Sequence, residues 1–599
     1  MRKLKSILFP CIIFVVIMFI VNNYAEAWPG TTSRVSVASD GTQSNNNSGS
    51  SFFLGIDISA DGRYVVFQSL ASNLVEDDTN GKQDCFVHDR TTNETKRISV
   101  STNGSEANDG CYYPSISDDG RYIVFASNAT NLIPDDTEGW WDVFMHDRVE
   151  ETTVRISETT EGTGGNGDSD TASISGNGNF VVFTTLAFNL DTTDSNIHRD
   201  IVVSNLQTGS IQIVSKASDG TQANDHSYRP SISQDGSYIS FNSAANNLVP
   251  DHTNNFSDVF IHNLQSGATT QVSRSTEGMI GNGPSDYGTI SRNGRYAVFN
   301  SYATNLVSGD TNNKDDTFMH DLITGVTVRV SVASDGTQGN NRSYFGIASE
   351  EREVVFFSSR ASNLVVGDNI GDDIFMYDIN SHRTSLMSVS TEGIPGNGNS
   401  NGIELSGDGY LMVFTSYANN LVEGDTNGLA DVFVRDTLES EYSLNVSVNP
   451  EGCGVIEIDP LQSTYLRGDE ITFTATSNDG CSFQNWSGDA TGTTNPLTMI
   501  VTGDINIIGN FLAEEYTLTA SASPESSGSV IVDPLKPTYQ YGEEITVTAL
   551  ANSGWSFHNW SGDASGATNP LTLIVTGNMS ISANFIEVQY LQFLPAIYR

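Results

Sequence analysis

Basic residues are scarce in this chain: 28 Lys and Arg stand against 72 Asp and Glu in 599 residues, a formal net charge of −44. A protein that binds nucleic acid or anionic lipid needs a basic surface to neutralise phosphates, so the composition argues against both partners. Charged residues make up 17% of the chain and hydrophobic residues 37%. The chain is therefore expected to fold around apolar cores and to cover its surface mainly with Ser, Thr, Asn and Gly.

Long apolar runs are missing except at the N-terminus. There, a basic start at residues 2–5 precedes the apolar stretch 7–21, and Ala25-Glu26-Ala27 fits a small-x-small cleavage site. Residues 1–27 are therefore predicted to be a signal peptide, with an uncleaved anchor helix as the alternative. No later segment has the roughly 20 apolar residues of a membrane span. We expect an exported protein without a membrane span after signal removal, extracellular or on the cell surface, with the periplasm as the alternative.

Helical periodicity is also missing, and an internal repeat takes its place. The phrase Asp61–Phe67 returns along the chain, and its closing residues are Phe67, Phe125, Phe183, Phe241, Phe299, Phe356 and Phe414, at intervals of 58, 58, 58, 58, 57 and 58. Each unit divides into four short strands rich in Val, Ile, Phe and Thr, with tight turns such as Asp119-Gly120 between them. Seven such units predict an all-β fold in which residues 28–440 form a seven-bladed β-propeller.

The repeat carries a family resemblance. The phrase Ser-x-Ser-x-Asp-Gly-Arg-Tyr-Val-Val-Phe, followed by a strand such as Asp142–Asp147, resembles the TolB-type and WD-repeat-like propellers of bacterial exported proteins. The resemblance implies the fold and leaves the activity open, because propellers host many functions. In the sixth unit Glu350-Glu351 replaces Asp-Gly, which predicts a wider turn.

The N-terminus of the mature chain is expected to close the ring. The phrase Arg329–Gln338, which ends one unit and leads to the next, has a copy at Arg34–Gln43, ahead of any first strand. The seventh unit has no evident copy after Asp436. We therefore predict that Arg34–Val37 is the outer strand of the seventh blade.

A second repeat follows the propeller. Tyr442–Phe511 and Tyr516–Phe585 align with an offset of 74 and share an Asn-Trp-Ser-Gly-Asp motif that contains Trp486 and Trp560. They resemble the divergent internalin-B-type repeats of bacterial surface proteins, which implies a spacer or adhesive role. The two tryptophans are interpreted as core anchors, with a ligand platform as the alternative. The predicted boundaries are 441–514 and 515–587, followed by an apolar tail, 588–599, that is either a final strand or a sorting signal.

Cysteines are few, and there is no Cys-x-x-Cys pair to indicate zinc or redox chemistry. The mature chain has four, an even number that suggests disulfides in an exported protein. Cys453 and Cys481 share one module and are replaced together in the second module, which favours a bridge between them. Cys85 and Cys111 are the remaining candidate pair.

The long links of the propeller units carry oxygen-bearing side chains at regular places. The first link has Asp78, Asn80 and Asp84; the pairs in the other links are Asp136 with Asp142, Asp194 with Asp200, Asp251 with Asp258, Asp310 with Asp316, Asp368 with Asp373, and Asp425 with Asp431. Such oxygens suit calcium, which takes six to eight hard ligands. The interpretation as a calcium site competes with a plain structural role, in which Asp and Asn stabilise turns. Calcium is the one cofactor that the sequence suggests.

No catalytic constellation is evident. Gly398–Gly402 matches a Gly-x-Ser-x-Gly pattern but lacks the strand–turn–helix context of a nucleophile. His88, His146, His262 and His320 recur at one strand position in different units, which indicates a structural role. In each unit the link between the second and third strands and the link to the next unit are long, and they are expected on one face of the propeller, the long-loop face. We expect a non-enzymatic binding or surface-interaction protein whose unknown protein or glycan ligand contacts this face. The alternatives are a carbohydrate-active propeller enzyme with central carboxylates and a TolB-like periplasmic assembly factor.

Overall fold

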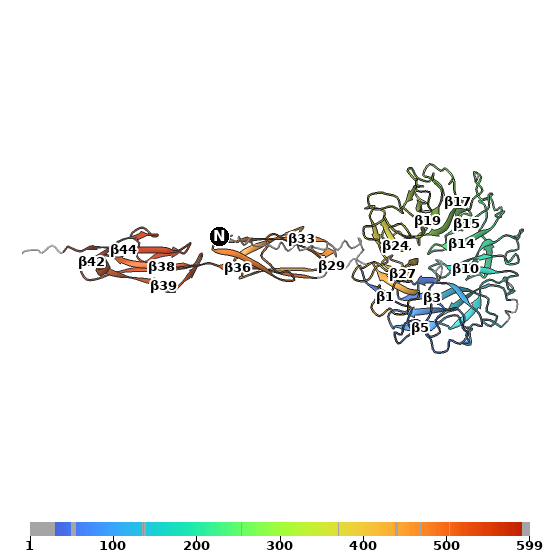
Figure 1. Ribbon diagram of the computed structural model, residues 1–599, viewed down its shortest axis with the longest axis horizontal. Coiled ribbons are helices and arrows are strands. Elements are labelled where there is room, and N and C mark those ends of the chain that lie inside the picture. The colour runs from blue at the N-terminus through green and yellow to red at the C-terminus, as the bar shows by residue number, and fades with distance from the viewer. Residues whose placement is uncertain are drawn as a thin grey trace, which may run out of the picture. The chain divides into compact units, whose positions relative to one another are not determined.

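The computed structural model describes residues 30–49, 55–134, 136, 139–252, 254–368, 371–437, 441–466, 469–501 and 504–589. The predicted signal peptide and residues 590–599 of the tail lie outside this part of the chain. Two compact units, Met1–Leu438 and Glu439–Arg599, are built almost entirely of β-strands (Figure 1). Among the residues described, no helix is long and apolar enough to cross a membrane.

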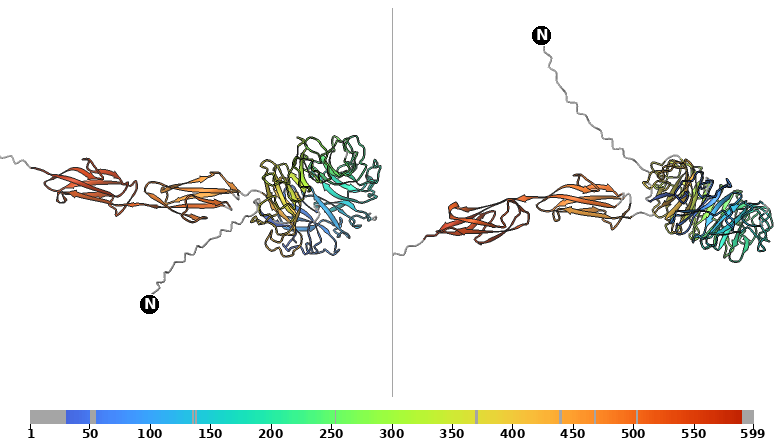
Figure 2. Two further views of the ribbon diagram at one scale, coloured as in Figure 1. Left: turned by 45° about the horizontal axis from the view of Figure 1, so that its top comes forward. Right: turned by 90° about the horizontal axis from the view of Figure 1, so that it is seen from below.

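The first unit is a ring of seven four-stranded antiparallel blades (Figures 1 and 2). Blades 1 to 3 consist of β2 (Ile56–Ile58), β3 (Tyr64–Ser69), β4 (Asp84–Asp89) and β5 (Glu94–Arg97); β6 (Cys111–Ile116), β7 (Tyr122–Ser127), β8 (Asp142–Asp147) and β9 (Thr152–Arg155); and β10 (Ser169–Ile174), β11 (Phe180–Thr185), β12 (Asp200–Asn205) and β13 (Ser210–Ile213). Blades 4 and 5 consist of β14 (Ser227–Ile232), β15 (Tyr238–Ser243), β16 (Asp258–Asn263) and β17 (Thr269–Gln271); and β18 (Ser285–Ile290), β19 (Tyr296–Ser301), β20 (Asp316–Asp321) and β21 (Thr327–Arg329). Blades 6 and 7 consist of β22 (Ser343–Ser349), β23 (Val354–Ser359), β24 (Asp373–Asp378) and β25 (Thr384–Leu386); and β26 (Ser400–Leu405), β27 (Leu411–Ser416), β28 (Asp431–Asp436) and β1 (Thr32–Arg34).

The N-terminal strand supplies the outer strand of blade 7. β1 is antiparallel to β28, with Thr32 opposite Arg435 and Arg34 opposite Phe433, and lies beside blade 7 in Figure 1. The ladder begins two residues before the expected Arg34–Val37, and the Val35 amide extends it with a hydrogen bond to the carbonyl oxygen of Val432 (2.9 Å). The first and last strands of the propeller segment are thus joined within one sheet, and β28 is not left as an open edge where the ring closes.

The second and third strands of each blade form its core. Their apolar side chains are almost fully buried, and in most blades a Phe from each strand stacks on the other, as in Phe67 with Phe86 (5.8 Å). In blade 6 the stacked residue is Phe357, opposite Phe375, so Phe357 and not Phe356 is the equivalent of the repeated Phe. The one-residue deletion therefore lies in the link that follows β23.

The turn of blade 6 corrects a second expectation. β22 runs on to Ser349, which pairs directly with Val354, so four residues join the two strands. In blade 2 five residues join β6 to β7. In blade 2, however, the Ser117 amide donates to the Tyr122 carbonyl oxygen across the same span (2.9 Å), so the turn without the Asp-Gly pair has the length of the others and is not wider.

The second unit contains two modules with the same topology. The first has β29 (Glu441–Tyr442), β30 (Leu444–Asn449), β31 (Gly454–Asp459), β32 (Tyr465–Leu466), β33 (Glu470–Ser477), β34 (Cys481–Gly488), β35 (Leu497–Ile500) and β36 (Ile505–Ala513). The second has β37 (Glu515–Tyr516), β38 (Leu518–Ser523), the 3₁₀-helix η1 (Glu525–Ser527), β39 (Gly528–Asp533), β40 (Tyr539–Gln540), β41 (Glu544–Ala551), β42 (Trp555–Gly562), β43 (Leu571–Ile574) and β44 (Met579–Glu587). Each forms two three-stranded sheets, ordered β30-β36-β34 and β31-β33-β35 in the first module.

The conserved tryptophan of the module repeat lies in the core. Trp486 and Trp560 are 2% and 1% exposed. Their indole Nε1 atoms donate to the carbonyl oxygens of Thr494 and Thr568, each at 2.8 Å. A buried indole with its one donor satisfied is a packing anchor and offers no face to a ligand.

Both cysteine pairs are joined in the structure. Cys85 in β4 is bonded to Cys111 at the start of β6, so this bridge links blades 1 and 2. Cys453 is bonded to Cys481 within the first module. The first bridge lies between blades, whereas the second closes a loop inside one small domain.

Candidate functional site

A cavity of about 170 Å³ with a mixed polar and apolar lining lies where the innermost strands of the seven blades meet. One register position of these strands lines it with Asp57, Ser115, Ser173, Ser231, Thr289, Ile347 and Glu404. The closure of the ring makes β2 and β26 neighbours. The two carboxyl groups of this row, on Asp57 and Glu404, therefore belong to adjacent blades. We call this cavity the central pocket.

Asp57 is held by hydrogen bonds from its own strand and from the next blade. Its Oδ2 accepts from Ser115 Oγ (2.9 Å) and from the Ile116 amide (2.8 Å), and its Oδ1 accepts from the Ile58 amide (2.7 Å). These donors favour the ionised carboxylate. They also fix the side chain against the wall of the pocket.

The two carboxyl groups perturb each other. Burial raises the pKa of Asp57 to about 6, against the opposing effect of its hydrogen bonds. Burial raises the pKa of Glu404 well above its ordinary value, and the negative charge of Asp57 raises it further. Both side chains are partly exposed, and the surface that they expose faces the pocket. A ligand in the pocket can therefore contact them, although the surrounding protein leaves them poorly solvated. The three donors oppose protonation of Asp57, whereas burial and the charge of Asp57 both favour the protonated form of Glu404.

A charged cluster forms the end of the pocket at the short turns. Arg292, after β18, forms an ion pair with Asp118, after β6, across the ring. Gln234, after β14, donates to the other oxygen of Asp118 (2.8 Å). Blade 2 is thus tied to blades 4 and 5 on the other side of the ring. The guanidinium of Arg292 also lowers the pKa of both Asp57 and Glu404, which partly offsets their burial.

Strained residues surround the pocket toward its other end. At a bulge two residues before the pocket-lining row, five blades place a non-glycine residue at positive φ: Tyr113 (57°), Thr171 (52°), Arg229 (54°), Tyr287 (53°) and Phe345 (48°). Each residue in this backbone region costs about 1–3 kcal/mol. Blade 7 has Gly402 at this bulge (φ 63°), and blade 1 has Gly55 at the equivalent position in a nearly extended conformation. Repeated strain of this kind is characteristic of binding sites, since it aims side chains that a regular strand would direct elsewhere.

The side chains at this bulge form an interacting group. The Arg229 guanidinium lies over the Tyr287 ring, 4.0 Å from its centroid, and pairs with Asp286 (2.6 Å). Tyr287 packs edge-to-face against Phe345 (6.5 Å between centroids). The pocket therefore combines aromatic faces, the guanidinium groups of Arg229 and Arg292, hydroxyls and a carboxyl pair, which is the pattern of a small-ligand site.

The Asp and Asn side chains of the long links lie among protein donors. Every closing Asp accepts a hydrogen bond from a Ser of its blade's outer strand region, as Asp84 does from Ser99 (2.6 Å) and Asp431 from Ser36 (2.6 Å). Further examples of this hydrogen bond are on Asp142, Asp200, Asp258, Asp316 and Asp373. These bonds secure the outer strand to its blade.

A side chain with a positive charge or an N–H donor faces most of the carboxylate pairs. Arg329 lies 3.2 Å from Asp310 and 3.5 Å from Asp316. The corresponding arginines are Arg97 with Asp78 and Asp84, Arg155 with Asp142, and Arg34 with Asp425 and Asp431. In blade 3 Gln222 donates to Asp194 and Asp200, and in blade 4 His252 contacts Asp258 while Asp251 is exposed. In blade 6 the pair consists of Asp368 and the buried Asp373, which share a hydrogen bond. In blade 2 both members of the pair, Asp136 and Asp142, are buried.

These contacts favour a structural role of the Asp and Asn side chains over the calcium interpretation, and both remain predictions. In four links an arginine already supplies the positive charge that calcium would supply, and an arginine and a dication would repel each other there. Asn80 Nδ2 donates to Asp84 (3.1 Å), so its amide presents a donor where a calcium ligand would present oxygen.

We accordingly expect 5 mM calcium to leave the melting temperature of the chelator-treated protein unchanged. Replacing Arg329 with Ala should create a site, so that calcium then stabilises the variant by about 1 kcal/mol. Lys314→Ala in the same link is the matched control, because Lys314 is exposed. Calorimetric scans with and without calcium measure both effects, and a calcium-dependent rise in the wild type would show that the links bind calcium as they are.

The remaining sequence candidates have structural roles. The four repeated histidines are buried or nearly so, and each Nδ1 forms a hydrogen bond with a Thr hydroxyl of the outer strand, as in His88 with Thr95 (2.9 Å). Ser400, the centre of the Gly-x-Ser-x-Gly pattern, is buried in β26 and shares a hydrogen bond with Ser416. Neither group reaches the central pocket.

The pocket residues were not singled out from the sequence, although a signal exists. Most units have Ser or Thr at the pocket-lining position, and the first and last units have Asp57 and Glu404. Where a unit has an ionisable residue in place of the usual Ser or Thr, that residue does not simply repeat the structural role that the other units share. It could have been found by aligning the units on their second strands.

Comparisons with known proteins agree with this architecture. Residues 444–515 and 516–589 each match the model of the divergent InlB B-repeat domain. No curated protein is significantly similar in sequence. Solved structures with a similar fold include an oligogalacturonate lyase from Vibrio parahaemolyticus (11% identity, covering 69% of this chain and 96% of that one, TM-score 0.43). Others are TolB from Acinetobacter baumannii (15%, 51% and 59%, 0.30) and the propeller domain of the Trilobed protease from Pyrococcus furiosus (11%, 65% and 95%, 0.39). At these values the likeness concerns the fold alone.

Proposed function

We propose that this is an exported binding protein whose propeller holds its ligand in the central pocket without chemical turnover. The strained ring of side chains around the pocket carries the proposal. Five separate blades retain an unfavourable backbone conformation at the same place, and its common consequence is to present Tyr113, Thr171, Arg229, Tyr287 and Phe345 around one cavity. A purely structural pore would lose nothing by adopting glycine there, as blades 1 and 7 do.

The ligand class that suits this surface is a saccharide. Hydroxyl groups of a sugar can exchange hydrogen bonds with the carboxyl pair and with the Ser and Thr row, while the aromatic rings at the bulge offer flat apolar faces. The size of the cavity suits one sugar unit or the end of a short oligosaccharide, rather than the middle of a long chain. The predicted signal peptide supports export, and an exported protein can encounter saccharides outside the cytoplasm. The two C-terminal modules serve as a spacer in this proposal.

Binding of a glycan array by the mature protein, followed by titration calorimetry of the best ligand, tests the proposal. Tyr287→Ala should weaken binding at least tenfold, because it removes the ring on which Arg229 lies and which borders the pocket. Tyr302→Ala is the matched control: it also belongs to blade 5, but its side chain is 52% exposed outside the pocket. Loss of binding in Tyr302→Ala alone would place the ligand on the outer long-loop face and contradict the central site.

The carboxyl pair supports a second candidate, acid–base catalysis on the same class of ligand. One protonated and one ionised carboxyl side by side is the requirement for general acid and general base catalysis of glycosidic cleavage. The array ligands should therefore also be incubated with the protein and analysed for products. Product formation that disappears in Glu404→Gln would favour the enzyme over the binding protein.

A further inference from the structure

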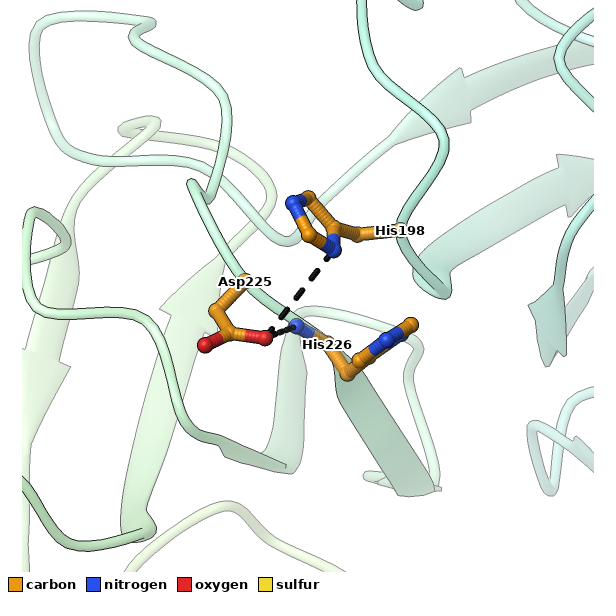
Figure 3. Close-up of side chains that lie close together, drawn as sticks. All are labelled: His198, Asp225 and His226. Atoms are coloured by element: carbon orange, nitrogen blue, oxygen red, sulfur yellow. Dashed lines mark hydrogen bonds and ion pairs between the residues drawn. The ribbon is translucent and has the colours of Figure 1, made fainter.

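Two histidines and an aspartate meet on neighbouring long links, away from the central pocket. His198 lies in the link between β11 and β12 of blade 3. Asp225 and His226 lie in the link that leads from β13 into β14 of blade 4. Figure 3 shows the carboxylate of Asp225 directed toward the ring of His198, with the ring of His226 beside them. The three side chains come from two segments that the blade junction brings together.

The distances within this group suit a shared ion. His198 Nδ1 is 3.9 Å from Asp225 Oδ1, and the two imidazole rings meet edge-to-face with 4.9 Å between centroids. One ligand atom of each residue lies within 4.8 Å of those of the other two. Atoms bound to one zinc ion at about 2.0–2.2 Å lie somewhat closer together than this, so modest side-chain rotations would complete the site. Rotation is open to these residues, because all three side chains are partly or largely exposed.

Backbone hydrogen bonds orient two of the three residues. The Arg199 amide donates to His226 Nδ1 (2.9 Å), which leaves that nitrogen unprotonated and directed toward the His198 link. The His226 amide donates to Asp225 Oδ1 (2.8 Å) and holds the carboxylate in place. A metal ion would compete with the Arg199 amide for the Nδ1 lone pair. The expected affinity is therefore moderate rather than that of a fully prepared structural zinc site.

The equivalent residues of blade 1 form an ion pair across the same two links. Lys82 and Asp109 lie 116 residues before His198 and Asp225, two repeats earlier, and form an ion pair of 3.0 Å. In blade 1 a lysine thus supplies a permanent positive charge between the two links. In blade 3 the imidazole of His198 replaces the ammonium, and the imidazole of His226 is added. The repeat has exchanged a built-in cation for two metal-binding groups around the retained carboxylate.

We propose that His198, Asp225 and His226 bind a divalent transition-metal ion of the zinc type, and that this ion joins the links of blades 3 and 4. Two imidazoles and one carboxylate are borderline ligands that suit zinc, cobalt or nickel better than calcium or magnesium. Three protein ligands leave at least one coordination position to water or to an oxygen or nitrogen donor of a ligand on the long-loop face. This site is independent of the central pocket and of the function proposed for it.

Titration calorimetry of the mature protein with zinc chloride tests the proposal. We expect one ion per chain with a dissociation constant in the micromolar range, and binding weakened at least tenfold in His198→Ala and in His226→Ala. His558→Ala is the matched control, because His558 is an exposed histidine of the second module, and it should bind as the wild type does.

Cobalt provides a second readout that does not depend on stability. Bound cobalt should give visible absorption typical of nitrogen and oxygen ligands in the wild type and in His558→Ala, and this absorption should be absent from both cluster variants. The melting temperatures of the metal-free variants should differ little from that of the wild type, since His198 is partly exposed, His226 is exposed and only the hydrogen bond from the Arg199 amide to His226 is lost. Zinc binding that is absent from the wild type, or that is equally strong in His198→Ala and His226→Ala, would overturn the proposal.

Discussion

Removing residues 28–40 is expected to lower the free energy of unfolding of the propeller by about 5 kcal/mol or more. The deletion takes away the ladder between β1 and β28, the buried side chain of Val35 and the hydrogen bond from Ser36 to Asp431. A buried Val contributes about 2 kcal/mol and each lost hydrogen bond about 1 kcal/mol. Because β28 would become an open edge where the ring closes, the loss should affect the transition of the whole ring. Scanning calorimetry of the mature and truncated chains measures it.

Point variants separate the contribution of the strand from a general effect of truncation. Val35→Asp places a charge at a position only 2% exposed and should reproduce much of the loss. Ser33→Ala, at an exposed position of the same strand, should be neutral. Arg435, buried opposite Thr32, donates to Thr32 Oγ1 (2.8 Å) and to the Val389 carbonyl (3.2 Å), so truncation also leaves part of its hydrogen bonding unmade. An unchanged melting curve after the deletion would show that β1 does not close the ring in solution.

Glu404→Gln is expected to stabilise the propeller at pH 8 while weakening ligand binding in the central pocket. The folded state raises the pKa of Glu404, so its protonated form is favoured in the fold. For a raised pKa, the associated stability is complete below the unfolded pKa of about 4.3 and is lost as the pH rises through the folded value. Gln does not titrate, has nearly the same shape, and therefore avoids this loss.

The pH dependence of the difference is the decisive measurement. Urea unfolding at pH 4.5 should give nearly equal stabilities for the wild type and Glu404→Gln, and the gap should open as the pH rises toward 8. Asp57→Asn should act in the same direction, and the double variant should gain less than the sum of both, because each removes the repulsion that the other removes. Glu423→Gln, an exposed position of blade 7, is the control. If Glu404→Gln were less stable than the wild type at pH 8, this result would contradict a raised pKa of Glu404 in the folded protein.

The architecture was predictable because its information is local and repeated. Each blade is one period of the sequence, so Val, Ile and Phe at alternating positions and the Asp-Gly turns define its strands without reference to other blades. The closing strand and the number of modules followed from counting copies. Errors arose where a copy is irregular: blade 6 has Phe357 rather than Phe356 in the stacked position, and its turn after Ser349 is not wider than the Asp-Gly turns.

The sites were decided by the tertiary structure. Asp57 and Glu404 are 347 residues apart in the sequence and become neighbours only because the ring closes. Arg292 reaches Asp118 across the ring, and Arg329 enters the link that was expected to hold calcium. Sequence by itself thus determined the periodic scaffold, since each strand's period and turns are encoded within one unit. Only the folded ring decided which charges meet, because the energy of a charge depends on the distance to its partners and on its burial, and neither can be read along the chain.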